Sequence, residues 1–384
     1  MKSMLSLSVI CTLLLVTASS FAGLYGDAPN ETHAWQVHDM RRERPAVVAP
    51  GKQVGDAPAD AIVLFDGSDL SKWEADKREK GVPSKWRIVK GVLESVRGAG
   101  YIRTKESFGD CQLHVEWATP IKVQGNSQGR GNSGVFLMGI YEVQVLDCFN
   151  NDTYPDGQAG SVYGQYPPLV NVCRGPGEWQ SYDIVFRQPR LKDGKLVRPG
   201  YLTVMQNGVL VQDHWVLEGP TGHMGRTKLR AHAEKQSFKI QDHGNPVRFR
   251  NIWIRELSER SDGGLNGPYT DPKVVKAKRA ETAAKIRQEA SDASDRLQRV
   301  QLLMESLAYE KETDTANRVE RMLTRFLGSF KEADQEKVES RKGQIMALRG
   351  SIKYLVRNKI VPGDYAPMVG IEALVKKYKL DEKK

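Results

Sequence analysis

The chain has 384 residues, of which 40% are hydrophobic and 27% are charged. This composition is globular and excludes wholesale disorder, and the length allows one large domain or two ordinary ones. The net charge of +10 is concentrated at one end, because residues 271–384 contain 25 Lys and Arg against 18 Asp and Glu. Since the rest of the chain is nearly balanced, we expect no nucleic-acid partner. The long apolar run is N-terminal, so we expect no internal membrane span.

Residues 1–22 are predicted to be a signal peptide. Lys2 gives the positive start, and residues 4–16 form the apolar core. Ser20 and Ala22 are the small residues that a signal peptidase reads, so cleavage after Ala22 is expected. The protein would then be periplasmic or secreted. The alternative, an uncleaved membrane anchor, needs a longer apolar run.

Cleavage would leave three cysteines, namely Cys111, Cys148 and Cys173. An odd number in an exported protein leaves at least one thiol free or in an intermolecular bridge. Cys148 and Cys173 flank a turn-rich segment, and two interpretations stay open. Either these two form a disulfide, or all three are small buried residues.

The composition and the hydrophobic pattern along the chain predict a β domain after an N-terminal arm. Residues 23–60 are rich in Pro, Gly, Ala and charged residues and are predicted to be an extended arm. From residue 61 to residue 257, short apolar or alternating runs are separated by Gly, Pro, Asn and Asp. Two of these runs meet at Asn207-Gly208, which is a strong hairpin signal. Many short strands without crossover helices predict a mostly β fold, either a sandwich or a jelly roll.

Residues 258–271 are predicted to be a linker, and residues 272–384 an α-helical hairpin or small bundle. Apolar residues recur there with alternating spacings of four and three, which is typical of the buried stripe of a helix. The stripe from Ile286 to Leu307 has alanine at two of its seven positions and is a weak dimer seam, so we expect packing within one chain. These helices are predicted to be dispensable for chemistry and to dock to another exported protein or to the cell surface.

Residues 131–147 are the most informative about chemistry. Alternate residues of a strand share a face, so Glu142 and Gln144 are expected to point the same way. A one-residue bulge near Leu146 would bring Asp147 beside them. Two carboxyl groups in one place can divide the roles of base and acid. We therefore predict Glu142 and Asp147 as catalytic residues, and the alternative is an ordinary solvent-facing polar strand.

The segments around this strand combine aromatic and polar residues. Sugar sites need both, because flat apolar faces stack on the ring and polar groups contact the hydroxyls. The alternatives are a core role for the aromatic residues and a surface ion-pair ladder for the arginines. The residues predicted to bind substrate are Gln144, Asn132, Ser133, Glu116, Tyr163, Trp179, Arg174, His243, Arg248 and Arg250.

Cofactor motifs are scarce. There is no phosphate-binding Gly loop, nucleophile elbow or dinucleotide fingerprint, so we expect no nucleotide cofactor. The histidine spacing matches no closed zinc site. His243 is a weak candidate ligand for a divalent metal ion held mainly by oxygens, and the question of a metal stays open.

Several motifs, in order along residues 60–257, together resemble the 3-keto-disaccharide hydrolase family. The resemblance implies a concanavalin-like jelly roll, and it does not cover the N-terminal arm or the helical C-terminus. It also implies cleavage of 3-keto-glycosides by 1,2-elimination to a 3-keto-2-hydroxy-glucal, which is then hydrated. The motifs are Phe65–Trp73, Gly131–Asp147, Gly157–Gly164, Pro176–Gln180, Asn207–Gln212 and Gln241–Asn251.

The E-x-Q-x-x-D pattern of residues 142–147 also resembles the E-x-D-x-x-E strand of laminarinase-like glycosidases. The middle acid is an amide here, and ordinary retaining hydrolysis needs two carboxyl groups roughly 5–5.5 Å apart. Cleavage of a keto-sugar glycoside depends less on a second carboxyl group, because the ketone at C3 acidifies the C2 proton. The first hypothesis is therefore an exported enzyme acting on keto-sugar glycosides. A non-catalytic sugar-binding module with a helical docking tail is the second, and a conventional β-glucanase is the third.

Overall fold

The computed structural model of the chain describes residues 24–258 and 270–382. The predicted signal peptide, residues 1–22, lies outside the described residues. The same holds for most of the predicted linker, residues 258–271. Within the described part, no helix is both long and apolar enough to cross a bilayer.

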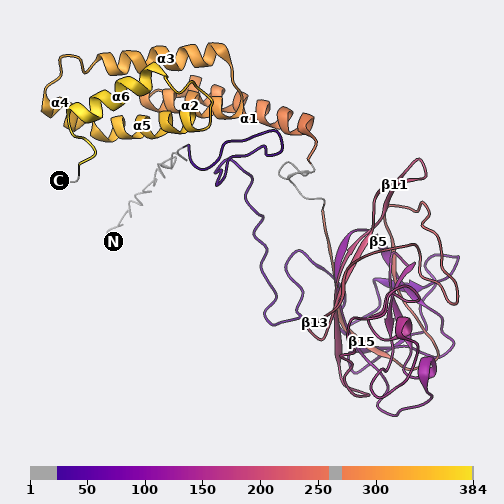
Figure 1. Cartoon of the computed structure of the whole chain (residues 1–384). Helices are drawn as coiled ribbons and strands as arrows, with labels where there is room; N and C mark the ends of the chain where they lie inside the picture. Colours follow the sequence, from indigo (N-terminus) through magenta and orange to yellow (C-terminus); the bar gives the residue numbers. More distant parts are fainter. Residues whose placement is uncertain (1–23, 259–269, 383–384) are drawn as a thin grey trace, which may run out of the picture. The chain divides into compact units, whose positions relative to one another are not determined.

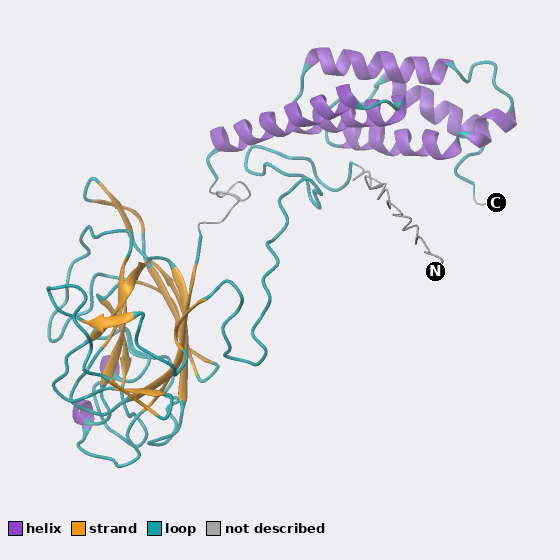
Figure 2. Cartoon of the chain, turned by 180° about the vertical axis from the view of Figure 1, so that it is seen from behind, coloured by secondary structure: helices purple, strands orange, loops and turns teal. Residues whose placement is uncertain are grey.

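Two compact units make up this structure (Figure 1). Residues 46–258 form what we call the β unit. Residues 24–45 and 270–382 form the helical unit, and Figure 2 shows that strands and long helices are segregated between the two.

Fifteen strands form the described part of the β unit. They are β1 (Ile62–Phe65), β2 (Trp73–Ala75), β3 (Arg87–Val89), β4 (Val92–Glu94), β5 (Ile102–Phe108), β6 (Cys111–Ala118), β7 (Ser133–Leu137), β8 (Tyr141–Val145), β9 (Gln180–Arg187), β10 (Arg190–Lys192), β11 (Lys195–Arg198), β12 (Tyr201–Gln206), β13 (Val209–Val216), β14 (Gln236–Ile240) and β15 (Arg248–Glu256).

The strands build two main antiparallel sheets and a small ribbon. The large sheet has the order β13-β12-β9-β6-β15-β4-β3, with β1 also paired to β15. The small sheet has the order β2-β5-β14-β7-β8, and β10 pairs with β11. Every second residue of a strand enters the core between the sheets, as Trp117, Tyr182 and Phe249 do from the large sheet. The predicted jelly-roll fold class is thereby confirmed.

Local signals in the sequence account for several of these strands. Asn207 and Gly208 have φ angles of 54° and 80°, which only a few residue types adopt easily, and they link β12 to β13. The predicted hairpin is confirmed. The Tyr182 hydroxyl crosses the core from β9 and donates to the Gln144 carbonyl oxygen at 2.6 Å, which ties the large sheet to β8.

Six helices are described in the helical unit. They are α1 (Pro272–Asp292), α2 (Arg296–Tyr309), α3 (Thr313–Gly328), α4 (Gln335–Ser340), α5 (Lys342–Arg357) and α6 (Ala366–Lys377).

The stripe predicted from Ile286 to Leu307 does not lie on one helix. Residues 293–295 separate α1 from α2, and Asp295 caps α2 by accepting the Gln298 amide hydrogen at 3.0 Å. The two halves of the stripe are therefore on helices that pack against each other within the unit. The helical C-terminal part of the predicted fold class is confirmed, but the continuous stripe was wrong because the sequence offers a good N-cap in its middle.

The predicted arm, residues 23–60, is not one extended segment. Residues 24–45 join the helical unit, where Arg41 donates to Glu305 of α2 at 3.0 Å and Trp35 packs on the helix core. Residues 46–60 join the β unit, where the Gly55 carbonyl oxygen accepts from the Trp253 indole at 2.8 Å. Composition alone missed this division, because the few apolar residues that dock the segment are diluted among polar ones.

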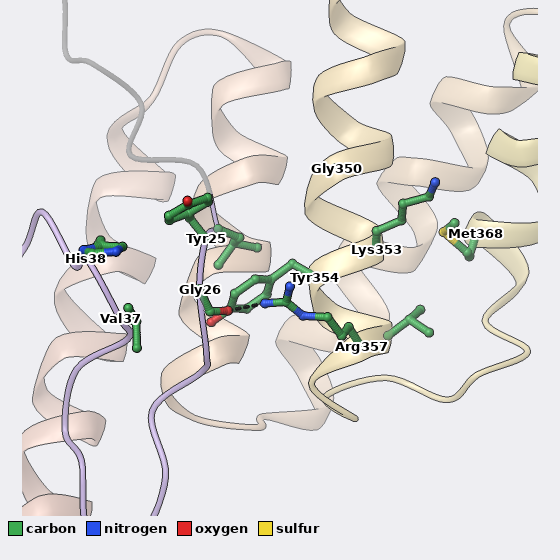
Figure 3. A pocket seen from close by; sticks show the side chains of 11 residues that line it. Tyr25, Gly26, Val37, His38, Gly350, Lys353, Tyr354, Arg357 and Met368 are labelled. Atoms are coloured by element: carbon green, nitrogen blue, oxygen red, sulfur yellow. Dashed lines mark hydrogen bonds between the residues drawn. The ribbon is translucent and has the colours of Figure 1, made fainter. Parts of the chain in front are cut away.

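Figure 3 shows where the N-terminal segment meets α5. Arg357 donates to the Gly26 carbonyl oxygen, and a cavity of about 680 Å³ lies beside this contact. Its lining is mainly apolar and aromatic. Lys353 at its edge is paired with Glu372 at 3.2 Å.

The three described cysteines are free thiols. Cys148 and Cys173 are neighbours whose side chains are in hydrogen-bond contact. This contact and, second to it, burial raise the pKa of the Cys148 thiol. Cys111 is buried in the core, as one of the two interpretations expected.

The division into units predicts that residues 46–258 fold alone. We expect this fragment to show one cooperative thermal transition at the temperature of the β unit in the full chain. A fragment of residues 24–258 should behave alike but expose the apolar segment around Trp35 and bind a hydrophobic dye. Calorimetry and dye fluorescence check both, and an unfolded 46–258 fragment would contradict the division.

Candidate functional site

The candidate site lies on the outer face of the small sheet, over β7 and β8. Tyr141, Val143 and Val145 of β8 are in the core. Glu142 and Gln144 alternate with them along the strand, so their side chains point outward. In register, Glu142 lies opposite Phe136 and Gln144 opposite Gly134 of β7. The two-residue alternation expected from the sequence is therefore observed.

A pocket of about 490 Å³ covers this face. Beside it lies a hollow of about 360 Å³ that shares part of its wall. The pocket is lined by Tyr101, Gln128, Asn132, Phe136, Glu142, Gln144, Tyr154, Tyr163, Thr221, Gly222, His223, Gln241 and His243.

Glu142 is the one carboxyl group among the described residues that line the pocket. It is 6% exposed, and its carboxyl group has no hydrogen-bond partner in the described part of the chain. Burial alone raises its pKa from 4.5 to about 8. A Cβ at Gly134 would lie well inside van der Waals contact with Glu142 Oε1 and 2.8 Å from a Phe136 ring carbon. The glycine thus leaves the room that the carboxyl group occupies.

Three amides lie beside this carboxyl group and are linked to one another. Gln128, from the turn at Ser127–Gly129, accepts from Gln144 Nε2 at 2.9 Å and from Asn132 Nδ2 at 3.3 Å. Asn132 and Gln144 are 3% and 1% exposed. The pocket therefore contains neutral hydrogen-bonding groups of fixed position around one buried acid.

Hydroxyl and imidazole groups also line the pocket. The Tyr163 hydroxyl is 2.8 Å from that of Tyr154 and 3.0 Å from His223 Nδ1. Burial raises the pKa of Tyr163, so its hydroxyl keeps its proton at neutral pH. Gln241 Nε2 donates to the Tyr101 hydroxyl at 2.6 Å, which leaves the hydroxyl hydrogen of Tyr101 for another acceptor.

Asp147 does not line the pocket. Strand β8 ends at Val145, and Asp147 forms an ion pair with Arg130 at 2.8 Å while accepting the Phe149 amide hydrogen at 3.2 Å. The bulge expected near Leu146 does not place this carboxylate beside Glu142. A basic partner that the sequence reasoning did not consider holds it elsewhere.

Other predicted residues are gathered on the outer face of the large sheet. Arg250 Nε donates to Glu116 at 2.6 Å, and the Arg250 guanidinium lies 4.1 Å from the centre of the half-buried Trp179 ring. Arg248 shares their face, and Arg174 donates to the Trp179 carbonyl oxygen at 3.0 Å. The alternation was read correctly, but β6 and β15 belong to the sheet that does not carry Glu142.

Two further predictions have distinct outcomes. Ser133 is on the inward face of β7 and donates to the Gln241 carbonyl oxygen at 2.6 Å, so it supports β14 rather than lining the pocket. His243 does line it. Among the described residues, no group of three or more His, Cys, Asp and Glu is arranged to hold a metal ion.

The structure thus brings together Glu142, Gln144, Asn132, Tyr163 and His243. Sequence reasoning missed Gln128 on a turn, Tyr101 just before β5 and Phe136 on β7. The ladder pairing of β7 with β8 and with β14 is the signal that finds Phe136, because it lies opposite both Glu142 and Lys239.

The two predicted acids should respond in opposite ways to neutralisation. Between pH 4.5 and about 8 the folded protein keeps a proton on Glu142 that the unfolded chain releases, so this group lowers stability as the pH rises. Glu142→Gln should therefore raise the melting temperature at pH 8 and leave it unchanged at pH 4.

Asp147→Asn should lower the melting temperature at pH 8 and reduce the unfolding free energy there by about 3 kcal/mol, because it leaves the 13% exposed Arg130 side chain without its carboxylate. Calorimetry of both variants over this pH range is the measurement. A destabilised Glu142→Gln protein at pH 8 would contradict the burial argument.

Comparison with known proteins gives this domain a family. The sequence matches the 3-keto-alpha-glucoside-1,2-lyase-like domain over residues 60–255. No protein of curated function matches.

Solved structures agree with that match. A candidate glycosyl hydrolase from Parabacteroides distasonis ATCC 8503 is 45% identical, with a TM-score of 0.55, over 58% of this chain and 97% of that one. Another candidate glycosyl hydrolase from that organism is less similar, at 21% identity and a TM-score of 0.38, over 52% of this chain and 94% of that one. Since the family match extends over half of the chain, the protein belongs to the family of 3-keto-alpha-glucoside-1,2-lyase-like domains.

Proposed function

We propose that the protein is an exported enzyme that cleaves 3-keto-glycosides by 1,2-elimination followed by hydration. The observation that carries the proposal is the single buried carboxyl group, Glu142, in a pocket of amides and hydroxyls. Ordinary glycoside hydrolysis, retaining or inverting, uses two carboxyl groups that flank the bond. Elimination from a keto-sugar needs one base, because the ketone makes the C2 hydrogen acidic.

Each group has a role in this scheme. The Glu142 carboxylate removes the C2 proton, and the electron pair moves toward the C3 oxygen. The Tyr101 hydroxyl, which accepts from Gln241, donates to that oxygen as charge develops. The Tyr163 hydroxyl, backed by His223 and Tyr154, protonates the departing O1 as the C1–O1 bond breaks.

The elimination product has a C1=C2 double bond conjugated to the C3 ketone. Water then adds its oxygen to C1, and a proton returns to C2, so the net result is hydrolysis. Family membership and the 45% identical candidate glycosyl hydrolase support action on a glycoside. The expected signal peptide supports export. Docking of a protein partner by the helices stays a prediction.

Turnover of a 3-keto-glucoside tests the proposal. Wild-type protein should consume it, and Glu142→Gln should lower kcat/KM by about 10³-fold, the usual contribution of a general base. An unoxidised glucoside is the substrate control. Binding of the keto-sugar without product would make the protein a sugar-binding module instead.

The pH dependence follows from the burial of Glu142. Its carboxylate, the base form, becomes populated as the pH approaches the raised pKa of about 8. The value of kcat/KM should therefore rise between pH 6 and 8. A fall over that range would assign Glu142 the role of acid and not of base.

Gly134→Ala should inactivate the enzyme without unfolding it. The backbone there is extended and accepts alanine, but the new Cβ displaces the Glu142 carboxyl group. A misplacement of about 1 Å costs on the order of 100-fold in rate. Gly129→Ala is the control, because its Cβ meets no atom within 4 Å. Equal turnover of the two variants would show that the carboxyl position is not critical.

A further inference from the structure

Gln128 lines the pocket in an orientation fixed by its other neighbours. Its Nε2 donates to the Gly157 carbonyl oxygen at 2.9 Å and to the Thr153 hydroxyl at 2.7 Å. A carbonyl oxygen only accepts, so the amide nitrogen of Gln128 must be at this end. Its Oε1 therefore faces Asn132 and Gln144.

That orientation determines the orientation of two more amides. Because Gln128 Oε1 accepts, it takes hydrogens from Gln144 Nε2 and from Asn132 Nδ2. Asn132 Nδ2 also donates to the Gln128 main-chain oxygen at 2.7 Å. The side-chain nitrogens of Asn132 and Gln144 thus both donate to Gln128, and the side-chain oxygen of each residue has no hydrogen-bond donor among the described residues.

These carbonyl oxygens are buried and have no partner in the described part of the chain. Asn132 Oδ1 and Gln144 Oε1 both lack a hydrogen bond, and so does Gln241 Oε1, whose Nε2 is used by Tyr101. Buried acceptors in native proteins are nearly always satisfied, so orphans that line a pocket indicate a ligand that donates. Among the described residues, no group of three or more His, Cys, Asp and Glu surrounds these oxygens in an arrangement that could hold a metal ion.

We propose that the pocket recognises its sugar by accepting hydrogens from two hydroxyl groups, at Asn132 Oδ1 and Gln144 Oε1, and that Gln128 is the positioning residue that sets this polarity. The inference rests on the proposed function for the substrate being a sugar. A hydroxyl group can donate or accept, but at these two oxygens only donation is productive. The pocket therefore discriminates by the direction of the hydrogen bond and not only by shape.

Deoxyfluoro analogues test the direction, because fluorine replaces a hydroxyl group of similar size and never donates. Methyl glucoside, methyl 3-keto-glucoside and their monofluoro derivatives are titrated by calorimetry into the Glu142→Gln protein, which does not turn them over. Fluorination at two positions should weaken binding about 10-fold or more, and elsewhere less than threefold. Equal affinity of all fluorinated forms would overturn the inference while leaving the proposed function intact. No binding of any parent sugar would overturn both.

Variants of Gln128 test its role. In Gln128→Met, the two amides lose their common acceptor and can turn, so the dependence on fluorine position should disappear. In Gln128→Glu, a protonated carboxyl group can donate to the Gly157 carbonyl oxygen while its other oxygen accepts from both amides, so the dependence should persist. This variant also tests the role if the Met variant fails to fold. Gln188→Met is the control, because Gln188 is a buried glutamine outside the pocket whose side chain likewise donates to a carbonyl oxygen, that of Glu234.

Two results contradict this role. A merely structural Gln128 would give a Met variant with lower melting temperature and an unchanged fluorine pattern. Calcium or magnesium titrated into the sugar-free protein should show no saturable binding. Binding that competes with the sugar would assign the free oxygens to a cation and overturn the inference.

Discussion

The site depends on the desolvation of one carboxyl group. Glu142 is on a strand whose other face builds the core, and loops cover its outer face so that water does not solvate the charge. The carboxyl group has no counter-ion and no hydrogen bond from any residue that the structure describes, and burial raises its pKa to about 8. Burial beside neutral amides and hydroxyls therefore gives a proton acceptor with a pKa near neutral pH.

The fold makes such a position possible through backbone pairing. Antiparallel pairing of β7 with β8 puts a glycine diagonally beside Glu142, and the absent side chain leaves space for the carboxyl group. Tyr182 ties the same strand to the opposite sheet through a buried hydrogen bond. The acid is therefore held on a rigid strand, while the hydroxyl and imidazole groups that face it come from longer connections.

The sequence predicted correctly those features whose signals lie within a few neighbouring residues. Alternation along one strand placed Glu142 and Gln144 on a common face, and Asn207-Gly208 identified a turn, because both signals are local. Asp147 lies only five residues from Glu142, yet its position is decided by Arg130, and no strand periodicity contains that ion pair. Arg248 and Arg250 share a face as expected, but which sheet carries β15 is a property of topology.

Local sequence patterns did not predict the roles of residues on turns or of residues that pair with distant parts of the chain. Gln128 acts through carbonyl oxygens whose location depends on the folded loop, and the N-terminal segment docks by a few side chains such as Arg41 and Trp35. The resemblance to a family supplied the chemistry that the E-x-Q-x-x-D spacing alone did not. The structure then removed the second acid from that scheme, which makes elimination the more economical mechanism.

Isotope incorporation tests the central claim most directly. Elimination followed by hydration removes the C2 hydrogen and returns one from solvent, whereas direct hydrolysis never touches the C2–H bond. A 3-keto-glucoside cleaved in deuterium oxide should give a sugar with deuterium at C2, as mass spectrometry and proton NMR of early product will show. The free 3-keto-sugar without enzyme is the control for spontaneous exchange. Product that forms with hydrogen retained at C2 would contradict the account.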